Sequence, residues 1–156
     1  MKRTIAIVAG GDSSELVVSL RSAQGLYSFI DKERYNLYIV EMEGHRWEVV
    51  LPDGSKTPID RNDFSFMENG EKKQFDFAYI TIHGTPGENG ILQGYFDLLG
   101  IPYSSCNVLV SAMTFNKFTC NQYLKGFGIR VAESLILRKG FDCLLYTSPS
   151  PRDTER

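Results

Sequence analysis

Short, β-rich and largely apolar segments alternate along the chain with segments whose apolar residues recur at helical spacing. Residues 4–9 (TIAIVA) form the first apolar run, which the Gly10-Gly11 pair breaks. Residues 36–43 (NLYIVEME) and 75–83 (FDFAYITIH) have the same character. An apolar run without strict alternation is typical of a strand that helices cover on both faces of a parallel sheet. The pattern therefore predicts three parallel strands, and residues 103–106 are expected to add a short fourth.

Three segments have the spacing of helices. Residues 14–30 gather their apolar side chains on one face, and residues 89–99 end at a glycine that favours a helix stop. Residues 107–124 are expected to be helical in two pieces. After them, residues 129–137 are predicted to form a further strand, the first of a new structural unit.

A small β-hairpin is expected between the second and third strands. Residues 47–50 and 56–59 flank a Pro-Asp-Gly turn at 52–54. The alternation of strands and helices predicts an α/β fold with a doubly wound parallel sheet, in which this hairpin is an insertion. Ligands of such sheets bind beyond the carboxyl ends of the strands, so segments 10–15 and 83–90 form the candidate site.

The composition is that of an ordinary globular domain. A length of 156 residues, 42% of them hydrophobic and 23% charged, suggests one domain with a buried core. A net charge of −2 without a basic stripe argues against nucleic acid or an anionic membrane as a partner. No apolar stretch approaches the roughly 20 residues that span a bilayer. Cys106, Cys120 and Cys143 match no zinc or redox spacing, so we expect reduced thiols in a cytoplasmic protein and no metal site.

The first candidate segment is AGGDSSE at residues 9–15, where the first strand turns into the first helix. Its two glycines allow a ligand close to the backbone, and free amides at a helix start favour an anion. The pattern is not G-x-G-x-x-G, so a dinucleotide site is not supported. Asp12 and Glu15 also have the spacing of a capping box, with Asp12 as the N-cap. The pattern alone favours capping for Glu15 and leaves ligand binding as the alternative.

The second candidate segment is ITIHGTPGENG at residues 80–90, in which His83 ends the third predicted strand. A histidine in this place can donate a hydrogen bond to a carboxylate or an oxyanion. Backbone groups can equally satisfy its ring, and the pattern weighs the two interpretations evenly. Glu88 is interpreted as a carboxylate at a helix N-terminus, where the helix dipole favours it.

Glu15 and His83, although far apart in sequence, are expected at the same edge of the sheet. A carboxylate and an imidazole that face one crevice can bind a zwitterion, the first holding the ammonium and the second lying near the carboxyl group. Lys117, within MTFNKFTCNQ, can reach a phosphate as a point charge. The pattern alone favours a surface lysine whose stem lies on apolar side chains.

Four stretches together resemble the D-alanine–D-alanine ligases of the ATP-grasp superfamily. They are IAIVAGGDSSELVVSL (5–20), HGTPGENGILQG (83–94), LGIPY (99–103) and AMTFNKF (112–118). The pairing of G-G-x-S-x-E-x-x-V-S with H-G-x-x-G-E-x-G-x-x-Q-G is far more specific than either half alone. The resemblance implies a Rossmann-like, pre-ATP-grasp N-terminal domain.

The same resemblance implies a reaction and a site. Enzymes of this family use ATP and magnesium to join two D-alanines for peptidoglycan. By resemblance, Glu15 binds the ammonium of the first D-alanine, His83 orients the substrate carboxyl, and Val18 packs on the substrate methyl. Gly84 belongs to the same substrate-binding set, and Lys117 contacts the ATP phosphates. The family also implies a cytoplasmic homodimer.

The chain resembles only the first part of such an enzyme. Residues 1–127 are predicted to be the substrate-binding domain, 128–140 the start of the central ATP-grasp domain, and 141–156 a non-native or disordered tail. The parts that hold ATP and magnesium have no counterpart here, so the chain is expected to be inactive alone. Two alternatives are a stand-alone module that binds an amino acid or dipeptide without chemistry, and a protein that docks on a full-length ligase.

Overall fold

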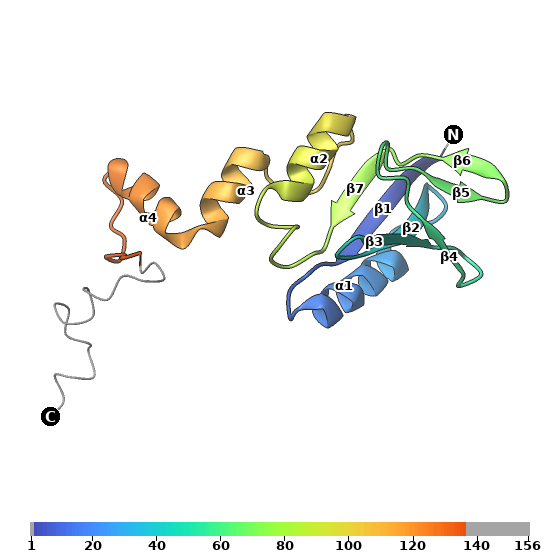
Figure 1. The fold of residues 1–156 in the computed structure, drawn as a ribbon, viewed down its shortest axis with the longest axis horizontal. Helices are drawn as coiled ribbons and strands as arrows, with labels where there is room; N and C mark the ends of the chain where they lie inside the picture. Colours follow the sequence, from blue (N-terminus) through green and yellow to red (C-terminus); the bar gives the residue numbers. More distant parts are fainter. Residues whose placement is uncertain (1, 137–156) are drawn as a thin grey trace, which may run out of the picture. The chain divides into compact units, whose positions relative to one another are not determined.

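A five-stranded sheet forms the centre of the computed structural model, which describes residues 2–136 (Figure 1). Strand β1 (Arg3–Gly10) pairs in parallel with β2 (Tyr35–Glu43) on one side and with β7 (Phe77–Ile80) on the other. The three predicted parallel strands are therefore confirmed, and β1 is the central one. Its carboxyl end lies beside that of β7 because both strands run in the same direction.

The predicted hairpin is confirmed, but it extends the main sheet. Strands β3 (Arg46–Val50) and β4 (Lys56–Pro58) add to β2 in antiparallel fashion, giving the order β4-β3-β2-β1-β7. Only Gly44 and His45 separate β2 from β3, and a parallel strand would need a crossover of a dozen residues or so. The sheet is consequently mixed, with a parallel centre and an antiparallel edge.

A second, two-stranded sheet was not expected. It consists of β5 (Phe66–Glu68) and β6 (Glu71–Lys73), which pair in antiparallel fashion. Asn69 and Gly70 form the turn between them and have positive φ angles of 52° and 80°. An Asn-Gly pair is a strong signal for a two-residue hairpin turn, so this feature could have been found in the sequence.

Helices cover both faces of the main sheet. Successive residues of a strand point to opposite faces, so Ile7 of β1 faces the core closed by α1 (Leu16–Phe29). Val8 faces the larger core, to which α2 (Ile91–Leu99) contributes. This arrangement confirms the doubly wound α/β class. The larger core is rich in buried aromatic side chains, namely Tyr38, Phe64, Phe66, Phe75 and Phe96.

The helical segment after α2 is divided as predicted. One residue, Asn116, separates helix α3 (Val108–Phe115) from helix α4 (Lys117–Gly126). The Asn107 side chain caps α3 by accepting a hydrogen bond from the Val110 amide at 3.0 Å. The expected fourth strand at 103–106 is reduced to an isolated parallel bridge to Ala78 of β7.

The chain divides into two units, whose described parts are residues 2–116 and 117–136. The strand predicted at 129–137 is wrong for residues 129–136, which form no regular element, and Leu137 lies outside the described residues. These residues pair with no strand of the two sheets within residues 2–136. The predicted tail at 141–156 also lies outside the described part, and the domain limits remain predictions.

Candidate functional site

Two glycine-rich loops meet at the carboxyl edge of the parallel strands. Loop A (residues 10–15) begins at the last residue of β1, and loop B (residues 83–88) comes after β7. The Asp12 amide donates a hydrogen bond to the Thr85 carbonyl at 3.2 Å, joining the two backbones. The Ser13 hydroxyl adds a second link, a hydrogen bond of 2.9 Å to the His83 carbonyl. The two segments selected from the sequence are thus in direct contact.

Close backbone packing around each of the two loops requires a residue without a side chain at one position. A Cβ atom on Gly10, whose φ is +105°, would lie 2.2 Å from the carbonyl oxygen of Met42 in β2. A Cβ atom on Gly87 would lie 2.4 Å from the Ile82 carbonyl oxygen. Both distances are far inside van der Waals contact, which begins at about 3.5 Å. The glycines of both motifs therefore have a packing role.

A buried polar link anchors loop A, and the sequence analysis missed it. Ser19 of α1 is fully buried, and its hydroxyl accepts a hydrogen bond from the Gly10 amide at 3.0 Å. Its oxygen also lies 3.3 Å from the Thr81 hydroxyl, which donates to the Val8 carbonyl at 2.9 Å. A serine on the apolar face of the helix, between Leu16 and Ala23, was the available signal. Loop A is thereby tied to β1 and to the segment that leads into loop B.

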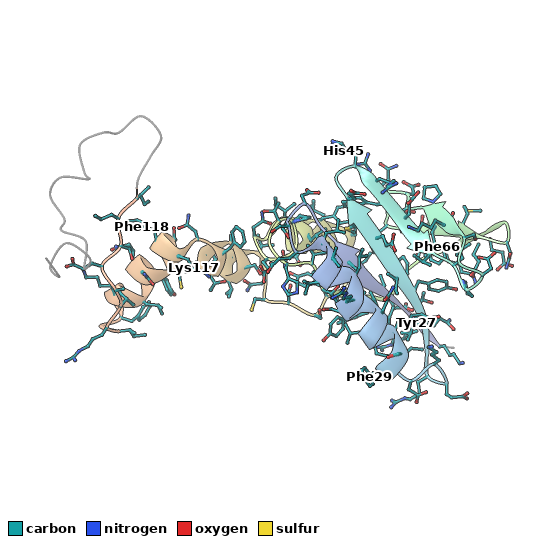
Figure 2. All side chains as sticks on the ribbon, turned by 90° about the horizontal axis from the view of Figure 1, so that it is seen from below. Tyr27, Phe29, His45, Phe66, Lys117 and Phe118 are labelled. Atoms are coloured by element: carbon teal, nitrogen blue, oxygen red, sulfur yellow. The ribbon has the colours of Figure 1, made fainter. Side chains whose placement is uncertain are left out.

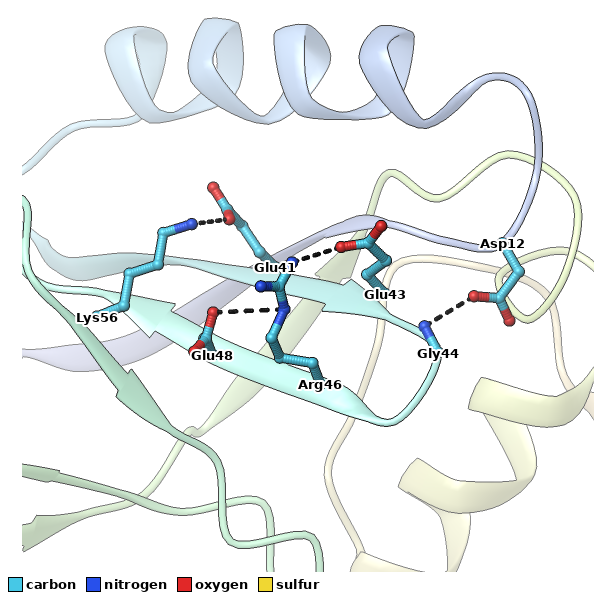
Figure 3. Close-up of polar contacts among 7 residues, drawn as sticks. All are labelled: Asp12, Glu41, Glu43, Gly44, Arg46, Glu48 and Lys56. Atoms are coloured by element: carbon cyan, nitrogen blue, oxygen red, sulfur yellow. Dashed lines mark hydrogen bonds and ion pairs between the residues drawn. The ribbon is translucent and has the colours of Figure 1, made fainter.

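The capping-box prediction for Asp12 and Glu15 is wrong. Helix α1 begins at Leu16, so Asp12 lies too far upstream to be its N-cap, and Glu15 occupies that position without a side-chain capping bond. The Asp12 carboxylate instead accepts a hydrogen bond from the Gly44 amide at 2.9 Å (Figure 3). The Glu15 side chain is exposed and makes no hydrogen bond or ion pair to any other residue between 2 and 136. Its carboxylate is therefore available to a ligand.

His83 is half-buried and lines a cavity of about 360 Å³ together with Tyr79 and Thr81. Gly84 follows it with a φ of +73°, and its amide donates to the Glu88 carboxylate at 2.7 Å. The interpretation of Glu88 as a helix N-terminal carboxylate is wrong, because α2 begins three residues later at Ile91. Glu88 closes the turn of loop B instead.

The remaining predicted site residues lie in different units. Val18, in the first turn of α1, is 50% exposed, so its side chain is accessible to a ligand. It shares unit 2–116 with both loops. Lys117, labelled in Figure 2, is the first residue of α4 and belongs to the second unit. The structure therefore brings four of the five predicted residues into one unit and assigns the lysine to the other.

Within the described part of the chain, no three His, Cys, Asp or Glu side chains gather as metal ligands. None of the helices between residues 2 and 136 combines the length and apolar character needed to cross a bilayer.

Comparison with known proteins decides the family. Residues 4–106, which include both loops, match the family model described as D-ala D-ala ligase N-terminus. The chain belongs to this family. A D-alanine–D-alanine ligase of Phocaeicola vulgatus is 99% identical over 142 residues, which are 91% of this chain and 44% of that protein.

Solved structures agree with this family assignment. D-alanyl-alanine synthetase A from Vibrio cholerae superimposes with a TM-score of 0.72 at 32% identity, covering 82% of this chain and 38% of its own. A D-alanine–D-alanine ligase from Bacillus anthracis, in complex with ATP, gives a TM-score of 0.63 at 28% identity over 84% of this chain and 39% of its own. The chain thus spans less than half the length of each of these three relatives.

Proposed function

We propose that the chain is the D-alanine-binding N-terminal part of an ATP-dependent D-alanine–D-alanine ligase that serves peptidoglycan synthesis. The observation that carries this proposal is the contact between loops A and B in a member of the family. The Ser13 hydrogen bond to the His83 carbonyl holds together the two segments that contain Glu15 and His83. The cavity of about 360 Å³ beside His83 is large enough for a ligand the size of an amino acid.

In this proposal the site holds the first D-alanine as a zwitterion. The Glu15 carboxylate binds the substrate ammonium, and His83 orients the substrate carboxyl group. Val18 packs on the methyl group, and Gly84 lets the ligand approach the backbone. The absence of a capping bond supports the role of Glu15, because nothing within residues 2–136 competes for its carboxylate. Fixing one end of the substrate holds its reacting carboxyl group in a defined orientation, which lowers the barrier to reaction.

The described residues fit only part of what the ligase reaction needs. Magnesium requires several oxygen ligands around one point, and residues 2–136 contain no such group. We infer that the remainder of the full-length protein holds magnesium and most of ATP, with Lys117 contributing a phosphate contact. The chain by itself is then inactive, and the complete enzyme acts as a cytoplasmic homodimer.

A phosphate-release assay tests whether the reaction requires the remainder of the full-length protein. The 156-residue chain, mixed with ATP, magnesium and D-alanine, should release no phosphate above background. The full-length Phocaeicola vulgatus ligase under the same conditions is the positive control. Turnover by the 156-residue chain would contradict the proposal that the missing part is indispensable.

Substitution of Glu15 tests the site itself. In the full-length ligase, Glu15→Gln should raise the KM for D-alanine by at least about tenfold, because a hydrogen bond to a charged group contributes about 1.5–3 kcal/mol. The melting temperature should hardly change, since the side chain caps no helix. Glu33→Gln, which removes an equal and exposed charge beyond the other end of α1, is the matched control. A lower melting temperature with an unchanged KM would restore a purely structural role for Glu15.

A further inference from the structure

The peptide unit between His83 and Gly84 is held at both of its polar atoms by side chains. Its carbonyl oxygen accepts a hydrogen bond from the Ser13 hydroxyl at 2.9 Å. Its amide donates to the Glu88 carboxylate at 2.7 Å. A peptide plane that is fixed at both ends cannot rotate, so the direction in which the His83 side chain leaves the backbone is also restricted.

Ser13 acts on loop A at the same time. Its hydroxyl oxygen accepts a hydrogen bond from the Glu15 amide at 3.2 Å while its proton goes to the His83 carbonyl. One hydroxyl therefore connects the backbone of Glu15 with the backbone of His83. The Ser13 side chain also packs closely on Gly84, with its Cβ 3.3 Å from the point where a Cβ of Gly84 would lie.

We propose that Ser13 is a positioning residue that sets the separation and relative orientation of Glu15 and His83 for the two ends of D-alanine. This inference rests on the proposed function. It assigns to Ser13 no contact with the substrate; the residue acts through the two that bind it. A shift of about 1 Å in either group is enough to misalign the bound substrate and slow the reaction severely.

The fold does not depend on this hydroxyl alone, which makes the role testable. Without it, the Asp12–Thr85 backbone hydrogen bond still joins the loops at 3.2 Å. The buried Ser19 hydroxyl still anchors the Gly10 amide at 3.0 Å. Removal of the Ser13 hydroxyl should therefore disturb substrate alignment much more than stability.

The experiment compares threonine and valine at this position in the full-length Phocaeicola vulgatus ligase. The two side chains have nearly the same shape, but only threonine carries a hydroxyl. Ser13→Val should raise the KM for D-alanine by about tenfold or more, whereas Ser13→Thr should stay within about threefold of the parent enzyme. Ser14→Ala is the matched control, because Ser14 is an exposed neighbour whose hydroxyl makes no hydrogen bond within residues 2–136.

The outcomes separate this inference from the proposed function. Equal KM values for Ser13→Thr and Ser13→Val, or a valine variant that loses only thermal stability, would overturn the positioning role. If Glu15→Gln in the same assay still raised the KM, the proposed substrate site would survive that result. If Glu15→Gln and both Ser13 variants all left the KM unchanged, the proposed substrate site would itself be refuted.

Discussion

Replacing Gly10 with alanine probes the backbone that carries the candidate site. Gly10 ends β1 with a φ of +105°, a region that residues with a Cβ avoid. The new Cβ atom would lie 2.2 Å from the Met42 carbonyl oxygen, which already accepts a hydrogen bond from the Gly11 amide at 2.8 Å. Met42 is buried within β2, so the strand cannot easily move away, and loop A must shift instead.

The expected loss of stability has two parts. Holding an alanine in the left-handed region costs about 1–2 kcal/mol. Moving loop A far enough to relieve the clash breaks the Gly11–Met42 hydrogen bond, a further loss of about 1 kcal/mol. Gly10→Ala should therefore lower the free energy of unfolding by about 2–3 kcal/mol. For a chain of this size, that corresponds to a fall in melting temperature of roughly 4–12 °C.

Urea unfolding of the 156-residue chain, followed by circular dichroism, measures this difference. Gly54→Ala is the control, because Gly54 has a comparable φ of +83° but open space around its Cβ position. It should show only the cost of the left-handed backbone, about 1–2 kcal/mol. Equal losses for the two variants would refute the argument that the contact with Met42 determines the role of Gly10.

Two further predictions concern buried polar groups. The Lys73 ammonium, and secondarily the Tyr38 hydroxyl, lower the pKa of the Glu68 carboxyl, because both donate hydrogen bonds to its charged form. Since this pKa is lower in the folded than in the unfolded chain, the stabilisation is complete above the pKa of an ordinary glutamate and is lost as the pH falls through the lowered value. Urea unfolding at a series of acidic pH values should show this decline, and Glu68→Gln should flatten it; an equally steep decline in the variant would contradict the assignment. Gln93, fully buried, donates to the Gly87 carbonyl at 2.6 Å, so Gln93→Met should lower the free energy of unfolding by about 1–3 kcal/mol at nearly unchanged volume. A methionine variant as stable as the parent chain in the same urea measurement would show that the buried carbonyl of loop B finds another partner.

The sequence predicted much of the architecture from local signals, although the Asn69-Gly70 hairpin was overlooked and the strand at 129–137 was wrong for its described residues. The apolar runs at 4–9 and 36–43 lie in β1 and β2, and the division of 107–124 lies where α3 gives way to α4. These features depend on side-chain periodicity and on glycine, which act within a few residues of themselves. The paired motifs at 5–20 and 83–94 likewise predicted the family, which the comparisons confirmed.

Two other errors concern contacts between segments that the sequence pattern did not connect. Asp12 and Glu15 have the spacing of a capping box, yet the helix begins too late for it, and Asp12 bonds to Gly44 across the sheet edge. The hairpin was expected as an insertion, yet β3 pairs with β2 and extends the main sheet. The bond from Gly44 to Asp12 could not be read from the local pattern around either residue, whereas the two-residue turn between β2 and β3 was a local signal that the prediction did not use.

The amino-acid sequence by itself determined the strand and helix alternation, the two glycine-rich segments at the carboxyl ends of strands, and the family. Only the tertiary structure decided which polar groups meet there: that Ser13 links the two loops, that Ser19 anchors one of them, and that the Glu15 carboxylate has no capping role. The physical reason is the distance along the chain over which each kind of interaction acts. Periodicity and turn preference act along the chain, whereas a hydrogen bond requires two atoms to lie within about 3 Å of each other in space, and packing of the whole sheet sets that distance.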